Sequence, residues 1–164
     1  MRELERTFLV RFLPSLEKCE FREIIDHYIP VSAEHPTVRV RKDGSRFEIT
    51  KKQPLSGDSS EQEEQTISLT EEEFIALINI PGRRLRKIRY FLDNAQIDVF
   101  QDGLSGLVLA DFEFATPEEK SAFAPPEFCL TDVTQESFIA GGLLAGKSYQ
   151  DIERRLESLG YAKI

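Results

Sequence analysis

The stretch RELERTFLV at residues 2–10 carries two carboxylates at alternate positions. Successive side chains of a β-strand point to opposite faces, so Glu3, Glu5 and Thr7 share one face of any strand formed here. Leu4, between the two glutamates, lies on the other face. Like charges on one face repel each other strongly if that face is enclosed, and in that case the strand would need a cation nearby.

A second stretch, TVRVRKDGSRFEITKK at residues 37–52, predicts a β-hairpin. Val and Arg alternate before Asp43–Gly44, a dipeptide typical of tight hairpin turns, and apolar and polar residues alternate again after it. Arg39 and Arg41 therefore share one face of the hairpin, as the two glutamates of the first strand share theirs. The strand before the hairpin turn therefore carries positive charge on one face, whereas the first strand carries negative charge.

Other alternating runs predict further strands, and the turns between them favour antiparallel pairing. These predicted strands cover residues 66–69, 87–92, 95–101 and 107–114. Helices are predicted where capping residues precede amphipathic stretches, within 70–82, 116–123 and 147–160. The polar stretch SGDSSEQEEQ at 56–65 has no periodicity and predicts a mobile loop. The pattern as a whole predicts an α+β protein that is mainly β.

Charged residues gather on one face of these strands and apolar residues on the other. The charged face holds Glu3, Glu5, Arg39, Arg41, Glu48, Thr50, Lys52, Lys87, Arg89, Gln96, Asp98, Asp111 and Glu113. Two arrangements fit this pattern: an open sheet with the charged face in water, or a closed sheet with the charged face inward. Enclosed carboxylates about 4 Å apart repel by about 4 kcal/mol at a typical effective dielectric, so the closed form requires a divalent cation. Its clustered Arg and Lys side chains require a polyanion such as phosphate.

Composition narrows the class of protein. The length of 164 residues fits a single domain over 1–164, and the net charge of -8 argues against nucleic acid as a partner. We expect no membrane partner and a cytoplasmic location, because no apolar run approaches the roughly 20 residues of a membrane span and the acidic beginning differs from a signal peptide. Basic charge is nevertheless concentrated: residues 39–52 and 83–89 hold eleven of the 21 Lys and Arg.

These motifs resemble, in order, those of the CYTH superfamily, the triphosphate tunnel metalloenzymes. ELERTFLV resembles the opening Glu-x-Glu-x-Lys signature, and the likeness extends over about residues 1 to 135. The further matching motifs are RVR, ITKK, RRLRKIRY, IDVFQDGLSGLVLADFEF and DVT. The resemblance implies an eight-stranded antiparallel β-barrel that forms a tunnel, flanked by short helices and a C-terminal helix. It favours the closed arrangement.

The resemblance also implies roles for individual residues. Metal ligands are expected at Glu3, Glu5, Asp111 and Glu113, with Mg²⁺ or Mn²⁺ as the ion. The triphosphate of a small-molecule substrate is expected to bind Arg39, Arg41, Lys52, Lys87 and Arg89. Catalysis is assigned to Glu5, Lys52 and Arg89, and supporting roles to Glu64 and Asp98.

One residue departs clearly from the signature: Thr7 stands where the family has Lys. The missing charge implies a weakened or retuned site. The first expectation is a metal-dependent hydrolase of inorganic triphosphate or another triphosphorylated small molecule. Two alternatives stay open, a catalytically weak protein that binds polyphosphate or nucleotide, and a class IV adenylate cyclase. The oligomeric state is left open between monomer and homodimer.

Overall fold

The structure is a computed structural model that describes residues 2–55 and 58–164, with side chains described for 4–53 and 60–164. Strands dominate it: β1 (Arg2–Val10), β2 (Glu20–Ile29), β3 (Val38–Asp43), β4 (Arg46–Leu55), β5 (Asp58–Leu69), β6 (Arg83–Leu92), β7 (Ala95–Phe100), β8 (Val108–Phe114) and β9 (Cys129–Asp132). The helices are short: α1 (Glu71–Ile78), α2 (Pro117–Ala122), α3 (Gly141–Leu144) and α4 (Tyr149–Ser158), with 3-10 turns η1 (Asp102–Leu104) and η2 (Ser137–Ile139).

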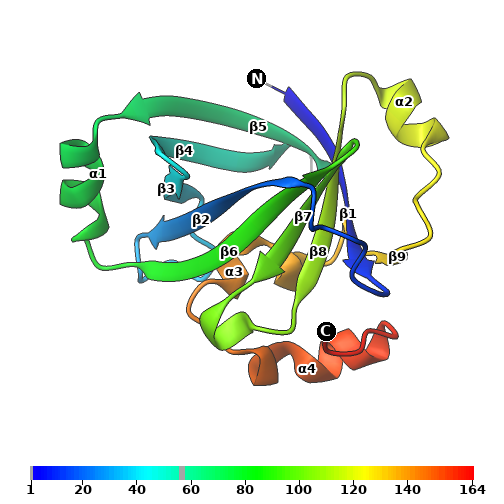
Figure 1. Ribbon diagram of the computed structural model, residues 1–164. Coiled ribbons are helices and arrows are strands. Elements are labelled where there is room, and N and C mark those ends of the chain that lie inside the picture. The colour runs from blue at the N-terminus through cyan, green and yellow to red at the C-terminus, as the bar shows by residue number, and fades with distance from the viewer. Residues whose placement is uncertain (1, 56–57) are drawn as a thin grey trace.

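In the part of the chain that the structure describes, eight strands close into a barrel (Figure 1). The order is β5-β4-β3-β2-β6-β7-β8-β1, and β1 pairs again with β5 to complete the ring. Every pairing is antiparallel. The ninth strand, β9, adds to the second half of β1. The predicted eight-stranded barrel is confirmed.

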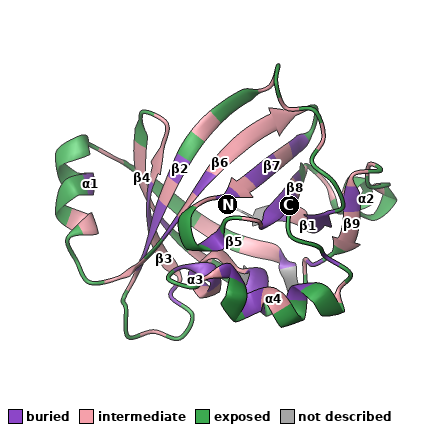
Figure 2. Cartoon of the chain, turned by 60° about the horizontal axis from the view of Figure 1, so that its bottom comes forward, coloured by how far each residue is buried: buried purple, intermediate pink, exposed green. Residues whose placement is uncertain are grey.

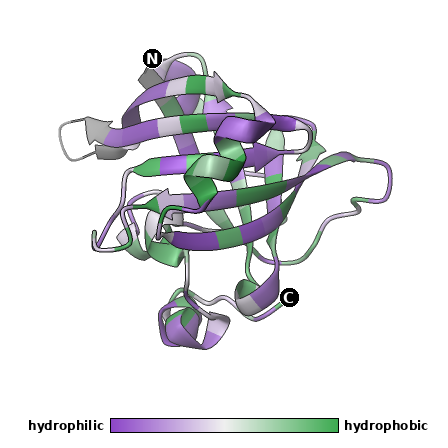
Figure 3. Cartoon of the chain, turned by 90° about the vertical axis from the view of Figure 1, so that its left-hand side faces the viewer, coloured by the Kyte–Doolittle hydropathy of each residue, from purple (hydrophilic) through white to green (hydrophobic). Residues whose placement is uncertain are grey.

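The alternation along the strands separates an apolar outside from a charged inside, as Figure 3 shows by the change of hydropathy from residue to residue. On β1, β7 and β8 the outward side chains Phe8, Ile97 and Phe112 belong to one buried apolar cluster, which the chain from Phe123 to Cys129 helps to cover. Phe74 of α1 packs on Phe47 of β4, with ring centroids 4.9 Å apart. The closed arrangement of the sheet is therefore the one the molecule adopts.

A second apolar cluster fills one end of the barrel interior. It joins inward side chains at strand ends, such as Tyr28, Leu85 and Leu109, to Ile139 of η2 and to residues of α3 and α4. Figure 2 shows the buried positions at α3 and on α4, whereas most of α1 and α2 is exposed. The charged part of the interior therefore lies toward the other end of the barrel.

Local signals in the sequence place most elements correctly. The hairpin turns at Gly44, which has a φ of 58°. Thr70 caps α1 through a complete capping box, Thr116 caps α2, and Gly160, with a φ of 82°, follows α4. No helix of the described residues is long and apolar enough to cross a membrane.

The predicted loop at 56–65 is wrong where the structure describes it. Residues 58–65 belong to β5, which pairs with β4 and, near Gln62, with β1; residues 56 and 57 lie outside the described part. This strand shows no apolar periodicity because its inner face lines the charged interior and much of its outer face is in water. The structure also adds β2 and β9, for which the sequence patterns above gave no assignment.

Candidate functional site

The inner faces of the strands enclose a cavity of about 460 Å³. Every predicted site residue whose side chain the structure describes lines this cavity. They are Glu5, Arg39, Arg41, Lys52, Glu64, Lys87, Arg89, Asp98, Asp111 and Glu113. The backbone of Glu3 pairs with Gln62 across the β1–β5 seam, but its side chain lies outside the described residues.

Arg41 is held by a buried carboxylate, Asp26 of β2. Its Nε and Nη2 donate to Oδ1 and Oδ2 of Asp26 at 2.6 and 2.8 Å, and only 1% of the Asp26 side chain is exposed. Burial alone would raise the pKa of Asp26, but the charge and hydrogen bonds of Arg41, with the charge of Arg39, lower it to about 2. The pair stays ionised and fixes the guanidinium in place.

Asp98 of β7 holds Arg89 and Lys87 of the neighbouring strand β6 in the same way. It accepts two hydrogen bonds from Arg89, at 2.7 and 2.8 Å, and one from Lys87. Burial acts to raise the pKa of Asp98, but the positive charges of Arg89 and Lys87 hold it well below its ordinary value. Two buried carboxylates thus position three cations around one cavity.

Arg39 is less completely satisfied than its neighbours. Its Nε is buried without a hydrogen-bond partner among the described residues, and lies 3.8 Å from Asp26 Oδ1. Arg39 therefore shares Asp26 with Arg41, and its Nη2 lies 3.9 Å from Glu48 Oε1. A buried guanidinium donor of this kind is suited to an anion in the cavity.

The acidic side of the cavity is formed by β1, β5 and β8. Glu5 lies directly opposite Glu113 in the β1–β8 register. Gln62 donates to Glu5 at 3.0 Å, and Gln96 donates to Glu113 at 3.0 Å. Lys52 lies 3.4 Å from Glu5 and 3.9 Å from Glu64, so it belongs to the acidic side rather than to the arginine wall.

Thr7, the residue in place of the signature Lys, points into the cavity and donates to Asp111 Oδ1 at 2.7 Å. The other oxygen of Asp111 lies 3.5 Å from Arg89. Burial, and then the charge of Asp98, raise the pKa of Asp111 against the opposing charge of Arg89. The hydroxyl of Thr7 therefore gives Asp111 a hydrogen bond but no positive charge. A lysine at position 7 would supply both.

The donor set fits a hard divalent cation. Glu5 and Glu113 are opposed carboxylates, which repel unless a cation lies between them, and carboxylate oxygens are the ligands that Mg²⁺ and Mn²⁺ prefer. Among the described residues no group of three or more His, Cys, Asp or Glu is arranged to hold a metal, and these do not include the Glu3 side chain. A third ligand from Glu3 stays a prediction.

Sequence reasoning missed Asp26 and Tyr28 because it missed their strand. The stretch EFREIIDHYI at 20–29 is rich in β-formers, and that enrichment was the available signal. On this strand Asp26 and Tyr28 face the cavity, whereas His27 faces outward and its Nε2 donates to Ile80 O at 2.7 Å. The carboxylate that fixes Arg41 was therefore outside the predicted site.

A closed antiparallel barrel whose interior carries a basic wall and an acidic wall around one cavity defines an anion-binding tunnel protein. The basic wall complements a chain of phosphates, and the opposed carboxylates complement a cation bound to that chain.

Comparisons with known proteins agree with this class. No model of a known protein family matches the chain. An inorganic triphosphatase from Nitrosomonas europaea is 32% identical over 143 residues, which cover 83% of this chain and 91% of the relative. A crystal structure of an inorganic triphosphatase superposes with a TM-score of 0.61 at 26% identity, over 87% of this chain and 93% of the other. A structure from Bacillus halodurans described as a candidate adenylate cyclase has a TM-score of 0.50 at 14% identity, over 99% and 93% of the two chains, and supports the fold alone.

The chain belongs to the CYTH superfamily, and the relatives reported above include inorganic triphosphatases.

Proposed function

We propose that the protein hydrolyses inorganic triphosphate in the barrel, with Mg²⁺ or Mn²⁺ bound to it. The observation that carries the proposal is the basic wall: Arg41 and Arg89 are each locked by a buried aspartate, and Arg39 keeps a buried donor without a partner among the described residues. A rigid array of guanidinium groups matches a linear chain of phosphates. The similarity to an inorganic triphosphatase supports the same substrate.

In this proposal Arg39, Arg41 and Lys87 bind the phosphate oxygens, and Lys52 and Arg89 lie at the bond that breaks. Water attacks a terminal phosphorus while the bridging P–O bond breaks, which releases phosphate and pyrophosphate. The cations stabilise the charge that develops on the leaving pyrophosphate, and Glu5 orients the attacking water. Because aspartates hold the cations in place beforehand, little reorganisation is needed at the moment of reaction.

The metal would be held by Glu5 and Glu113, together with Glu3 and Asp111. When bound, such an ion supplies further charge stabilisation at the phosphoryl oxygens. Asp111 is already engaged by Thr7 and lies near Arg89, so the protein restrains this ligand before a metal binds.

The test is phosphate release from tripolyphosphate with Mg²⁺ or Mn²⁺, compared with the Arg39→Ala variant. Hydrolysis that Arg39→Ala weakens and that the exposed control Arg154→Ala leaves unchanged would support the proposal. Tight binding of tripolyphosphate without phosphate release in either metal would favour the second candidate, a polyphosphate-binding protein. The observation that favours this candidate is Thr7 in place of the signature Lys. Formation of cyclic AMP from ATP would favour the cyclase.

A further inference from the structure

Three charged residues lie just beyond the cavity, at the end away from the apolar plug formed around Tyr28. Arg22 is on β2, six residues from Tyr28 on the same inner face and so about 20 Å from it. Asp43 ends β3, two residues beyond Arg41, and Arg46 begins β4. We call Arg22, Asp43 and Arg46 the mouth cluster.

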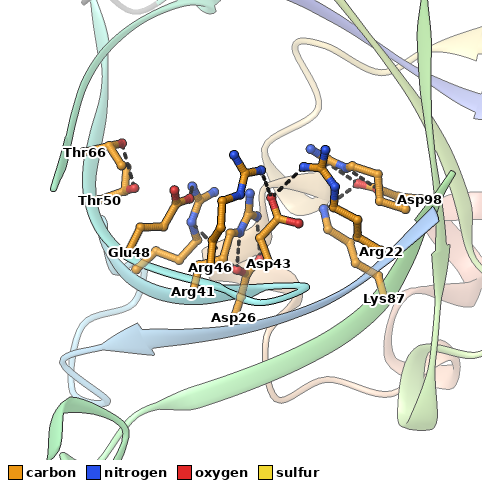
Figure 4. A network of polar contacts seen from close by, with 12 residues as sticks. Arg22, Asp26, Arg41, Asp43, Arg46, Glu48, Thr50, Thr66, Lys87 and Asp98 are labelled. Carbon is orange, nitrogen blue, oxygen red and sulfur yellow. Dashed lines mark hydrogen bonds and ion pairs between the residues drawn. The ribbon is translucent and has the colours of Figure 1, made fainter. Parts of the chain in front are cut away.

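The two arginines of the mouth cluster share one carboxylate oxygen. Arg22 Nη1 and Arg46 Nη2 donate to Asp43 Oδ2 at 3.4 and 3.0 Å, and Figure 4 shows the Asp43 carboxylate between the two guanidinium groups. A guanidinium has five N–H donors, and the contacts among the described residues use one donor of Arg22 and one donor of Arg46. The cluster therefore carries a net positive charge and spare donors.

The cluster continues the basic wall of the cavity. Arg22 is directly opposite Arg89 in the β2–β6 register, so two like charges face each other across neighbouring strands. Asp98 is shared between Arg89 and Lys87 and cannot neutralise Arg22 as well. Among these contacts Arg22, Arg46, Arg89 and Lys87 together face Asp43, Asp98 and Asp111, which leaves one positive charge at this end of the barrel.

The chemistry of the cluster points to a phosphate rather than to an organic group. Guanidinium groups bind phosphate through pairs of donors, and the ring of Phe91 is already covered by Arg22, whose Cζ lies 4.8 Å from the ring centroid. The ring therefore restrains Arg22, which covers one of its faces. Same-face residues of a strand are about 7 Å apart, so the cluster lies one such step beyond Arg41.

We infer that the mouth cluster is a further phosphate subsite, which binds the fourth and later phosphates of linear inorganic polyphosphates. The inference rests on the proposed function, because the cavity must hold the first three phosphates of the same chain. Arg22 and Arg46 act as binding residues of this subsite, and Asp43 spaces them apart.

The experiment measures binding by calorimetry without divalent metal, for tripolyphosphate and for linear tetrapolyphosphate. The wild-type protein should bind tetrapolyphosphate about tenfold more tightly, since one contact between charged groups is worth about one power of ten in affinity. Arg22→Gln and Arg46→Gln should each reduce that preference severalfold, while tripolyphosphate binding changes by less than about twofold. Arg154→Gln, an exposed arginine of α4, is the matched control and should change neither constant.

A third variant gives a result in the opposite direction. Asp43→Asn keeps a side-chain oxygen that accepts from both arginines but removes the negative charge, so tetrapolyphosphate should bind more tightly. Damage to the fold would not tighten binding. Equal affinity for the two anions in the wild type, or equal losses of both in Arg22→Gln and Arg46→Gln, would overturn the subsite and leave the triphosphatase proposal standing. Failure to bind tripolyphosphate at all would overturn both.

Discussion

The pair of Asp26 and Arg41 should stabilise the fold as well as orient the site, and Asp26→Asn separates the pair. Only 1% of the Asp26 side chain and 10% of the Arg41 side chain are exposed, so the variant leaves a buried cation without its counter-charge. Removal of one partner of a buried ion pair commonly costs about 3–5 kcal/mol. Because Asn keeps one acceptor for Arg41, we expect about 3 kcal/mol, near the lower end of that range.

The contribution of the Asp26 carboxylate to the free energy of unfolding can also be obtained from its pH dependence. The pKa of Asp26 is lowered from 3.8 to about 2 in the folded protein, which corresponds to about 2.5 kcal/mol. A lowered folded-state pKa stabilises the protein above the unfolded value of 3.8, and this contribution is lost as the pH falls through about 2. The difference in stability between wild type and Asp26→Asn should therefore be largest above pH 4 and shrink as the pH falls toward 2.

The assay is urea unfolding followed by circular dichroism at several pH values, because the chain contains no Trp for fluorescence. The matched control is Asp102→Asn, since Arg86 also donates twice to Asp102, at 2.9 Å each, but 63% of that side chain is exposed. The control should lose little stability, because exposed ion pairs are screened by water. If Asp26→Asn lost no more than the control, or kept a constant deficit from pH 7 to pH 2, the reasoning about the buried pair would be refuted.

Three further predictions concern the cavity. Arg39→Ala should weaken tripolyphosphate binding by about 1.5–3 kcal/mol in calorimetry, the range for a hydrogen bond to a charged group, and an unchanged dissociation constant would remove Arg39 from the site. Glu113→Gln should abolish the rise in melting temperature on addition of Mn²⁺ without unfolding the protein, because a carboxylate ligand is lost; a full rise would contradict its role. Thr7→Lys should raise the rate of tripolyphosphate hydrolysis at least about tenfold, or about 1.4 kcal/mol, by adding a cation, and a lower rate in a folded variant would mean that the Thr7 hydroxyl on Asp111 is itself required.

The alternation of charged and apolar residues predicts the strands and their two faces, and it fits both an open and a closed sheet. Arg39 and Arg41 alternate with valines, and Asp111 alternates with Phe112 on a later strand, so each face can be read from one strand alone. The order of the motifs then favours closure over an open sheet. The cavity lining confirms where these side chains point, although their roles in binding and catalysis stay predictions.

Periodicity fails where neither face of a strand is simply apolar. Residues 58–65 of β5 are polar on both faces, and their extended form is set by backbone pairing with β4 and β1, which are distant in sequence. Asp26 was missed because its strand was missed, and its pairing with Arg41 of β3 is a contact between strands. Contacts of this kind depend on tertiary structure, and local propensity carries little information about them.

Long stretches of the chain separate strand β1 from its partners β5 and β8. Leu4 pairs with Phe114, 110 positions later in the chain, and with Glu61 of β5 across a seam of three described pairs. At about 5–20 residues per second, several seconds of synthesis separate Leu4 from each of these two partners. Pairing over such a distance in the chain carries a large loop-closure entropy. Glu5 and Glu113 meet only when β1 pairs with β8, so the repulsion between them arises after the hairpins between these two strands can already have formed.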